Sequence, residues 1–204
     1  MRKVFSHNWL LAVVVAALFS LAGAGLSMAS AAGRVLYNAD GTTVTPVGTT
    51  FTASGTNVEL SNGLITNTCT MDVTGQVGDN GSVSGSPTAS LTAVTFPTCS
   101  AFGTTSSALP WTLNMPSAGN PGTITGAQVT LNVFGIFNCT FTESGASVKG
   151  VWNNGSPSSV TLQGSMPLTS GPSSICGSSG TINGTVAVSS TSTPGNNLLI
   201  YPNP

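Results

Sequence analysis

The chain has 204 residues, of which 40% are hydrophobic and only 4% are charged. A chain of this length can bury one core of ordinary domain size, and its hydrophobic share argues against disorder. The scarcity of basic residues excludes the electrostatic footprint of a nucleic-acid-binding protein and a cationic face for anionic membranes.

Residues 1–31 predict a secretory signal peptide. They contain a positive start, an unbroken apolar run and a small-x-small cleavage site, namely Arg2 and Lys3, Leu10–Phe19, and Ala29-Ser30-Ala31. The run is too short to cross a bilayer comfortably, although a buried helix or a membrane anchor is the alternative. We expect cleavage after Ala31 or Ala32, and a secreted, extracellular or cell-surface protein without a membrane span once the signal is removed.

Residues 32–60 come next and predict two or three short strands. Their apolar positions are Val35, Leu36, Tyr37, Val44, Val47 and Phe51, with an Asp40-Gly41 turn after the first three. Short apolar runs bounded by such turns are typical of strands.

The following segment alternates between apolar and polar positions. One face carries Ile65, Cys69, Met71 and Val73, and the other carries Thr68, Thr70, Asp72 and Thr74. A period of two with one polar face indicates an antiparallel sheet that packs one face on the core.

A sequence pattern starting at Cys69 occurs twice. The first copy reads Cys69-Thr70, Gly75, Gly85-Ser86-Pro87 and Phe96-Pro97, and the second reads Cys139-Thr140, Gly145, Gly155-Ser156-Pro157 and Met166-Pro167. Chance is the alternative in a chain rich in Gly, Ser and Thr, but the scarce Cys and Pro residues fall in register. The pattern predicts one β domain over 32–204 built from two similar halves, with pseudo-repeats at about 58–115 and 128–190.

All four cysteines lie beyond the predicted signal, at Cys69, Cys99, Cys139 and Cys176. An even number in an exported chain favours two disulfides. The repeat favours Cys69–Cys99 and Cys139–Cys176, one in each half, while the two other pairings remain open. Zinc is the rival, but the spacings are long and no CxxC pair is present.

Four large apolar residues could have roles outside the core. Phe134 and Ile136 interrupt the polar side of the alternating segment 129–141, so they mark either an apolar surface patch or a second packed layer. Trp111 and Trp152 are either core residues or, for one of them, part of a face that contacts an apolar ligand.

The turns and the chain's end complete the fold prediction. Asn-Gly pairs suited to two-residue hairpins occur at Asn62-Gly63, Asn80-Gly81, Asn154-Gly155 and Asn183-Gly184. The apolar segment Leu198–Tyr201 is either a last strand or a strand that pairs with a neighbouring molecule. No helical periodicity occurs after the signal, so we predict an all-β, antiparallel β-sandwich, or a partly open barrel.

The residues available for catalysis are few. His7 is the only histidine and leaves with the signal, so a nucleophile activated by histidine cannot form in the mature chain. Asp72 and Glu143 lie on polar strand faces and are better explained as solvated side chains than as a glycosidase pair. We therefore predict that the protein is not an enzyme and has neither a metal nor a cofactor.

Several short motifs in order resemble one family of bacterial secreted proteins. They are Ala108-Leu109-Pro110-Trp111-Thr112, Val151-Trp152-Asn153-Asn154 and Gly180-Thr181-Ile182-Asn183-Gly184-Thr185, with cysteines between them. Together they resemble the activators of alkane oxidation (PraB-like). The resemblance implies an exported protein of the cell surface or biofilm matrix that is linked to growth on long-chain alkanes, and it brings no catalytic residues.

Two functions of different classes follow. The first is a non-enzymatic surface or matrix protein that self-associates or binds other matrix components, with residues 32–60 or Leu198–Tyr201 as strands donated to another copy. The alternative is a soluble module that binds an apolar small molecule such as an alkane.

Overall fold

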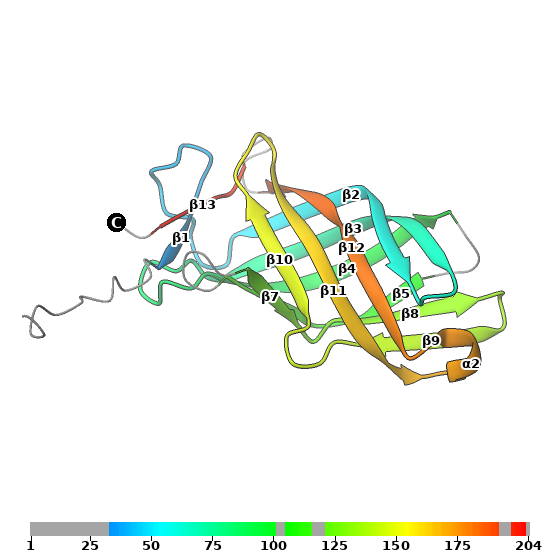
Figure 1. The fold of residues 1–204 in the computed structure, drawn as a ribbon. Helices are drawn as coiled ribbons and strands as arrows, with labels where there is room; N and C mark the ends of the chain where they lie inside the picture. Colours follow the sequence, from blue (N-terminus) through cyan, green and yellow to red (C-terminus); the bar gives the residue numbers. More distant parts are fainter. Residues whose placement is uncertain (1–32, 101–104, 116–120, 192–196, 203–204) are drawn as a thin grey trace, which may run out of the picture. The chain divides into compact units, whose positions relative to one another are not determined.

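The computed structural model describes residues 33–100, 105–115, 121–191 and 197–202 (Figure 1). The predicted signal peptide, residues 1–31, and its predicted cleavage site lie outside these ranges. Residues Ala31–Pro204 group into one compact unit by their contacts.

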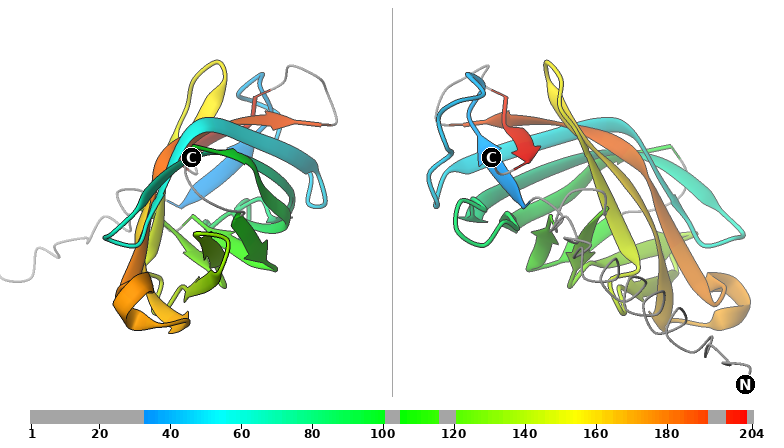
Figure 2. Two further views of the ribbon diagram at one scale, coloured as in Figure 1. Left: turned by 90° about the vertical axis from the view of Figure 1, so that its right-hand side faces the viewer. Right: turned by 60° about the vertical axis from the view of Figure 1, so that its left-hand side comes forward.

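Eight antiparallel strands form a closed barrel (Figures 1 and 2). They are β2 (Thr50–Ser61), β3 (Thr66–Asp79), β4 (Thr88–Cys99), β6 (Trp111–Asn114), β7 (Gly122–Thr125), β10 (Val148–Asn153), β11 (Ser158–Ser170) and β12 (Ser179–Ser190). Each pairs with the next barrel strand along the chain, and β12 returns to β2. The ring closes because β10 pairs with both β7 and β11. This up-and-down order leaves the barrel without free edges.

Two insertions in this order form a smaller sheet at one end of the barrel. Strand β5 (Thr105–Ala108) lies between β4 and β6 in the chain, and the hairpin of β8 (Gln128–Val133) and β9 (Phe137–Thr142) lies between β7 and β10. They pair in the order β5–β8–β9 and join the barrel through β11. The short helix α2 (Ser173–Cys176) lies between β11 and β12 near the same end (Figure 1).

The first and the last of the described strands form a ribbon at the opposite end of the barrel. Strand β1 (Arg34–Tyr37) pairs antiparallel with β13 (Leu199–Pro202), so that Leu36 lies opposite Ile200. Figure 2 shows this ribbon beside the barrel strands at the end farthest from α2. We call it the β1–β13 ribbon.

Alternation along the strands fills the barrel with apolar side chains. On β3 the predicted core face is buried, with Cys69, Met71 and Val73 at most 6% exposed. Inward-facing residues of every barrel strand contribute to one hydrophobic cluster. The barrel is therefore a packed core, as expected for a small closed sheet.

The all-β antiparallel prediction is confirmed, and the architecture is a barrel rather than a sandwich of two separate sheets. The predicted partly open barrel is close to this fold, but the β7–β10 and β10–β11 pairings close the ring. The equivalent sequence marks fall on different elements. Cys69 and Gly75 share strand β3, whereas Cys139 lies on β9 and Gly145 in the turn after it. The division into repeats at 58–115 and 128–190 stays a prediction.

Candidate functional site: the ribbon-covered end of the barrel

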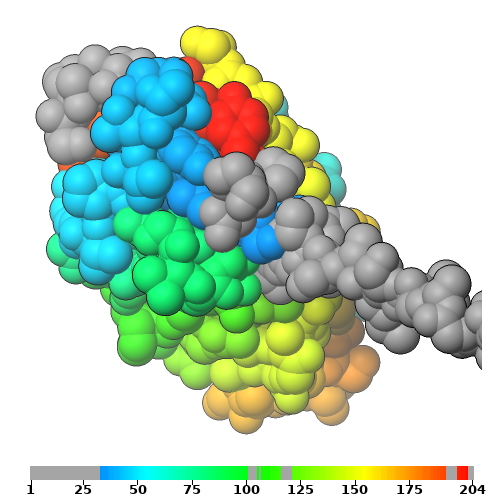
Figure 3. Space-filling view, turned by 90° about the vertical axis from the view of Figure 1, so that its left-hand side faces the viewer, coloured from blue at the N-terminus to red at the C-terminus, as the bar shows by residue number. Residues whose placement is uncertain are grey.

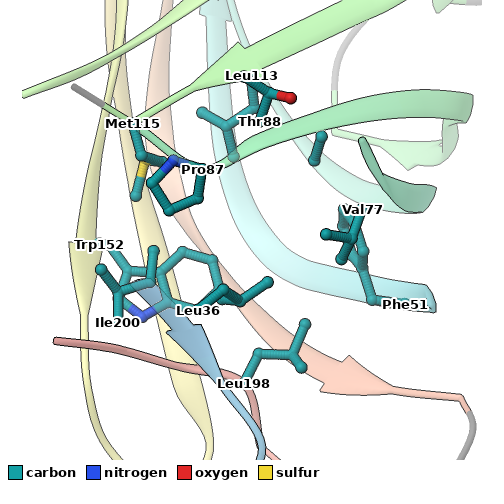
Figure 4. Close-up of a pocket in the computed structure, with 11 residues that line it drawn as sticks. Leu36, Phe51, Val77, Pro87, Thr88, Leu113, Met115, Trp152, Leu198 and Ile200 are labelled. Atoms are coloured by element: carbon teal, nitrogen blue, oxygen red, sulfur yellow. The ribbon is translucent and has the colours of Figure 1, made fainter. Parts of the chain in front are cut away.

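Two small cavities lie inside the barrel at the ribbon end. One has a volume of about 30 Å³ and lies directly under the ribbon (Figure 4). The second, of about 40 Å³, lies deeper among the barrel strands. Phe51, Leu113 and Trp152 line both cavities and form the partition between them. Apart from the Thr88 side chain, the lining of the two cavities is made of apolar residues.

Three side chains cover the outer cavity, two of them from the ribbon and the third, Leu198, from the residue just before β13. Leu36, Leu198 and Ile200 are 6%, 1% and 9% exposed, and all three contribute to its lining. Leu198 and Ile200 are two residues apart and share one face of the extended chain, as the strand period requires. Burial of each such side chain contributes about 1.5–3 kcal/mol. Apolar contact is therefore a main attraction between the ribbon and the barrel.

Trp152 and Trp111 occupy different positions in this end of the barrel. Trp111 is completely buried, and its indole N–H donates to the backbone oxygen of Ala108 at 2.8 Å. Trp152, on β10, is half-buried and packs against the core. Its indole Nε1 donates to Oδ1 of Asn154 at 3.0 Å. Trp111 is thus a core residue, whereas Trp152 extends from the cavities to the surface.

Asn154 connects Trp152 to the ribbon. It lies in the turn between β10 and β11, and its Oδ1 also accepts the backbone N–H of Ile200 at 2.9 Å. Its Nδ2 donates to the backbone oxygen of Ile200 at 2.8 Å. The amide side chain thereby bonds both backbone groups on the outer edge of β13, as a neighbouring strand would. Figure 3 shows β13, in red, between the blue β1 segment and the yellow β10–β11 hairpin.

The other edge of the ribbon is held by backbone groups. The N–H of Arg34 donates to the oxygen of Gly85, and the N–H of Leu36 donates to that of Asn80. The chain comes very close here, because a Cβ added to Gly81 would lie 2.1 Å from the oxygen of Arg34. Gly81 also has a φ of 80°, which glycine tolerates best. The predicted Asn80-Gly81 turn therefore also packs against β1 and accepts a hydrogen bond from it.

The loop between β1 and β2 contains Asp40, a carboxylate held by hydrogen bonds from its own loop. Asp40 accepts hydrogen bonds from the side-chain hydroxyl and backbone N–H of Thr43 and from the backbone N–H of Thr42. These bonds favour the ionised form and lower the pKa of Asp40 to about 2. They hold the loop that follows β1 in a tight turn.

Both disulfides lie toward the end of the barrel that is opposite the ribbon. Cys69 on β3 is bonded to Cys99 on β4, with their Cα atoms 4.0 Å apart. Cys139 on β9 is bonded to Cys176 of α2, with a Cα separation of 5.4 Å. These are the two pairs that the sequence repeat predicts. Among the described residues, no three His, Cys, Asp or Glu side chains gather as ligands of a metal ion would.

Phe134 and Ile136 are not part of the cavity lining. They lie at the tip of the β8–β9 hairpin, where Phe134 is 55% and Ile136 is 74% exposed. Of the two interpretations offered by the sequence, the structure thus has an exposed apolar tip and not a second packed layer. The proposed contact role of these residues stays a prediction.

The sequence alone did not predict that Leu36, Leu198, Ile200 and Asn154 lie together at one end of the barrel. The sequence shows the apolar runs Val35–Tyr37 and Leu198–Tyr201 separately, and it predicts the second as a last strand or a donated one. In the structure this segment pairs with β1 of the same chain. Asn154 carried only a turn signal, since its contact with Ile200 spans 46 residues.

Comparison with known proteins gives one family match. A family model described as "Alkane oxidation protein activator PraA/PraB-like" matches residues 7–194. No curated protein and no solved structure gives a match. Within the described residues, no helix has the length and apolar character needed to span a membrane.

Proposed function

Because the chain belongs to the PraA/PraB-like family of alkane oxidation protein activators, we propose that it is an exported, non-catalytic protein that binds an apolar molecule such as an alkane in its barrel. Binding would promote alkane oxidation by bringing the poorly soluble substrate into a water-compatible form outside the cell. The residues proposed to contact the ligand are those around the partition formed by Phe51, Leu113 and Trp152.

The observation that carries this proposal is the apolar lining of the barrel end. Thirteen residues line the inner cavity, and each of them has an apolar side chain. An apolar cavity of about 150 Å³ in a protein interior stays dry and binds apolar molecules. Burial of each methylene group contributes about 0.8 kcal/mol. A hydrocarbon chain that enters as side chains move would be buried against this apolar lining and would need no polar partner.

The size of the cavities indicates the shape of the ligand. Ordinary ligand pockets enclose about 300–1,000 Å³, far more than the cavities of about 30 and 40 Å³. Side chains must therefore move when a ligand binds. The cavities lie one behind the other and share Trp152, so its displacement would join them. A slender, flexible chain fits such a path better than a rigid ring.

Export and the lack of a catalytic role have separate support. Two disulfides suit an oxidising compartment, in agreement with the signal peptide predicted at residues 1–31. An activator family also fits a protein that assists an enzyme rather than one that turns over the substrate itself.

The test is a binding measurement with the mature chain, residues 32–204. Hexadecane and shorter n-alkanes are added while the emission of Trp152 is followed in a Trp111→Phe background. Saturable quenching or a spectral shift is expected. A Trp152→Phe chain in the same background serves as the signal blank. Failure of radiolabelled alkane to co-elute with the protein at the alkane's solubility limit would overturn the proposal.

A second candidate function is favoured by the exposed tip of the β8–β9 hairpin. Phe134 and Ile136 are exposed apolar side chains two residues apart, in a chain with only 4% charged residues, so few charges oppose association. In this case the protein would self-associate as a component of the cell surface or biofilm matrix. Sedimentation of the mature chain and of an F134S/I136S variant tests it, because only the former should form oligomers. A monomeric mature chain at all concentrations would exclude this candidate.

A further inference from the structure

We infer that the β1–β13 ribbon is the movable entrance of the barrel site, that Asn154 is the latch that keeps it closed, and that an uncharged hydrocarbon chain enters by displacing Leu198 and Ile200. This inference rests on the proposed function, since it names the route and the ligand class for the same site.

The β13 side of the ribbon is held to the barrel less extensively than the long barrel strands are held to one another. Strands β11 and β12 pair continuously from Ser158–Val188 to Pro167–Ser179. In contrast, the outer edge of β13 is bonded at Ile200 by a single side chain, Asn154. Elements with few backbone hydrogen bonds to their surroundings open at lower free energy than the rest of a structure. Opening at β13 therefore leaves the barrel ladders intact.

The latch is coupled to the cavity through Trp152. One oxygen, Asn154 Oδ1, accepts both the indole N–H of Trp152 and the backbone N–H of Ile200. A ligand that displaces the Trp152 ring breaks the bond between its indole N–H and Asn154. The Asn154 side chain is then less firmly oriented for its bond to Ile200. The side chain that senses the cavity is thus bonded to the same atom that holds the ribbon.

The side chains under the ribbon indicate the ligand class. Leu198 and Ile200 fill the mouth of the barrel beside Leu36 and leave a residual cavity of about 30 Å³. When these two side chains move away, they expose an apolar surface. A saturated hydrocarbon chain can cover this surface, so one set of apolar contacts replaces another. Neither cavity has a charged residue in its lining. An n-alkane therefore suits the site better than the alkyl chain of a fatty acid, whose carboxylate would be desolvated at the mouth.

The experiment compares Asn154 with its neighbour Asn153. Asn153 is also an exposed asparagine of the β10–β11 hairpin, but its side chain bonds Val151 and Thr161, away from the ribbon. The Asn154→Ala and Asn153→Ala variants and the chain without either change, all mature and in the Trp111→Phe background, are mixed with hexadecane or with palmitate. The uptake rate is measured by stopped-flow Trp152 emission. Loss of the latch hydrogen bonds should raise the hexadecane uptake rate about tenfold in Asn154→Ala, which corresponds to about 1.4 kcal/mol, and less than twofold in Asn153→Ala. Palmitate should bind at least tenfold more weakly than hexadecane.

A second variant and a ligand-free measurement keep the test decisive. Asn154→Asp preserves the shape and the acceptor oxygen but places a carboxylate oxygen against the carbonyl oxygen of Ile200, so uptake should rise at least as much as in Asn154→Ala. Hydrogen exchange of the Ile200 amide, followed without ligand, should accelerate about tenfold in Asn154→Ala while the amides of β11 stay protected.

The outcomes separate this inference from the proposed function. If wild-type protein binds hexadecane but all three variants take it up at the wild-type rate, the entrance lies elsewhere and the latch is wrong. If palmitate binds as tightly as hexadecane, the assigned ligand class is wrong. If neither ligand binds to any variant, including a chain ending at Asn197 that lacks β13, the proposed function itself is wrong and the inference fails with it.

Discussion

The two ends of the barrel are closed in different ways. At one end the disulfides Cys69–Cys99 and Cys139–Cys176 join β3 to β4 and β9 to α2. At the other end the β1–β13 ribbon is held by apolar contacts, loop backbone groups and the side chain of Asn154. Covalent links resist opening on any timescale that preserves the disulfide, whereas noncovalent contacts of this kind open and close reversibly. The barrel is thus stable as a whole while one end remains able to open.

The largest expected effect comes from removing a disulfide. The linked cysteines are 30 and 37 residues apart, so each link contributes about 3.5–4 kcal/mol by restricting the unfolded chain. C69A/C99A and C139A/C176A variants should each lose about that much free energy of unfolding in urea titrations. Exchange at the Ile200 amide should keep its wild-type rate well below the unfolding transition. Faster exchange of the ribbon in either variant would show that the two ends are not independent.

A smaller, local effect is expected at the ribbon. Ile200→Ala removes a buried side chain that covers the outer cavity, and we expect a loss of about 2 kcal/mol, at the low end for such changes. Hydrogen exchange should show that the loss is concentrated in β1 and β13. Tyr201→Ala is the matched control, because Tyr201 is 40% exposed on the same strand. Equal exchange changes in the barrel strands and the ribbon would contradict a separately opening end.

Alanine substitutions at two glycines, both in Asn-Gly turns, test how closely the ribbon packs on the barrel. Gly63 and Gly81 both follow asparagine and have φ values of 83° and 80°. A Cβ at Gly63 meets nothing within 4 Å, but one at Gly81 lies 2.1 Å from the oxygen of Arg34. Both alanine variants share the left-handed strain of about 1–2 kcal/mol, and Gly81→Ala should cost at least about 1 kcal/mol more in thermal or urea unfolding because β1 must shift. Equal losses would mean that β1 is not seated on this turn.

The smallest effect concerns pH and the loop after β1. The pKa of Asp40 is lowered from 3.8 to about 2, so its hydrogen bonds stabilise the loop above pH 4 and are lost as the pH falls through about 2. A carboxyl titration followed by NMR should give this midpoint, with the Thr42 and Thr43 amide signals moving in parallel. Asp40→Asn should abolish the movement of those signals. A midpoint near 3.8 would show that the loop is not held by Asp40.

Local patterns in the sequence determined much of the fold. Alternation placed Cys69, Met71 and Val73 on a core face because side chains alternate along any strand, whatever its partner. The Asn62-Gly63 and Asn80-Gly81 pairs marked turns for an equally local reason, the need for positive φ. The turn predicted at Asn183-Gly184 is wrong, because both residues lie inside strand β12. The repeat also indicated the two cysteine pairs, since each joins positions within one half of the chain.

Only the tertiary structure decided which surfaces meet. Closure of the barrel depends on β10 pairing with two partners, and a strand's own residues do not specify how many neighbours it has. The ribbon joins Arg34–Tyr37 to Leu199–Pro202 across nearly the whole chain, and either segment alone is an ordinary short apolar run. Asn154 became a latch, and Phe134 and Ile136 an exposed tip, because of where the folded barrel places them. Long-range pairing is set by the packing of the complete core, which no single segment encodes.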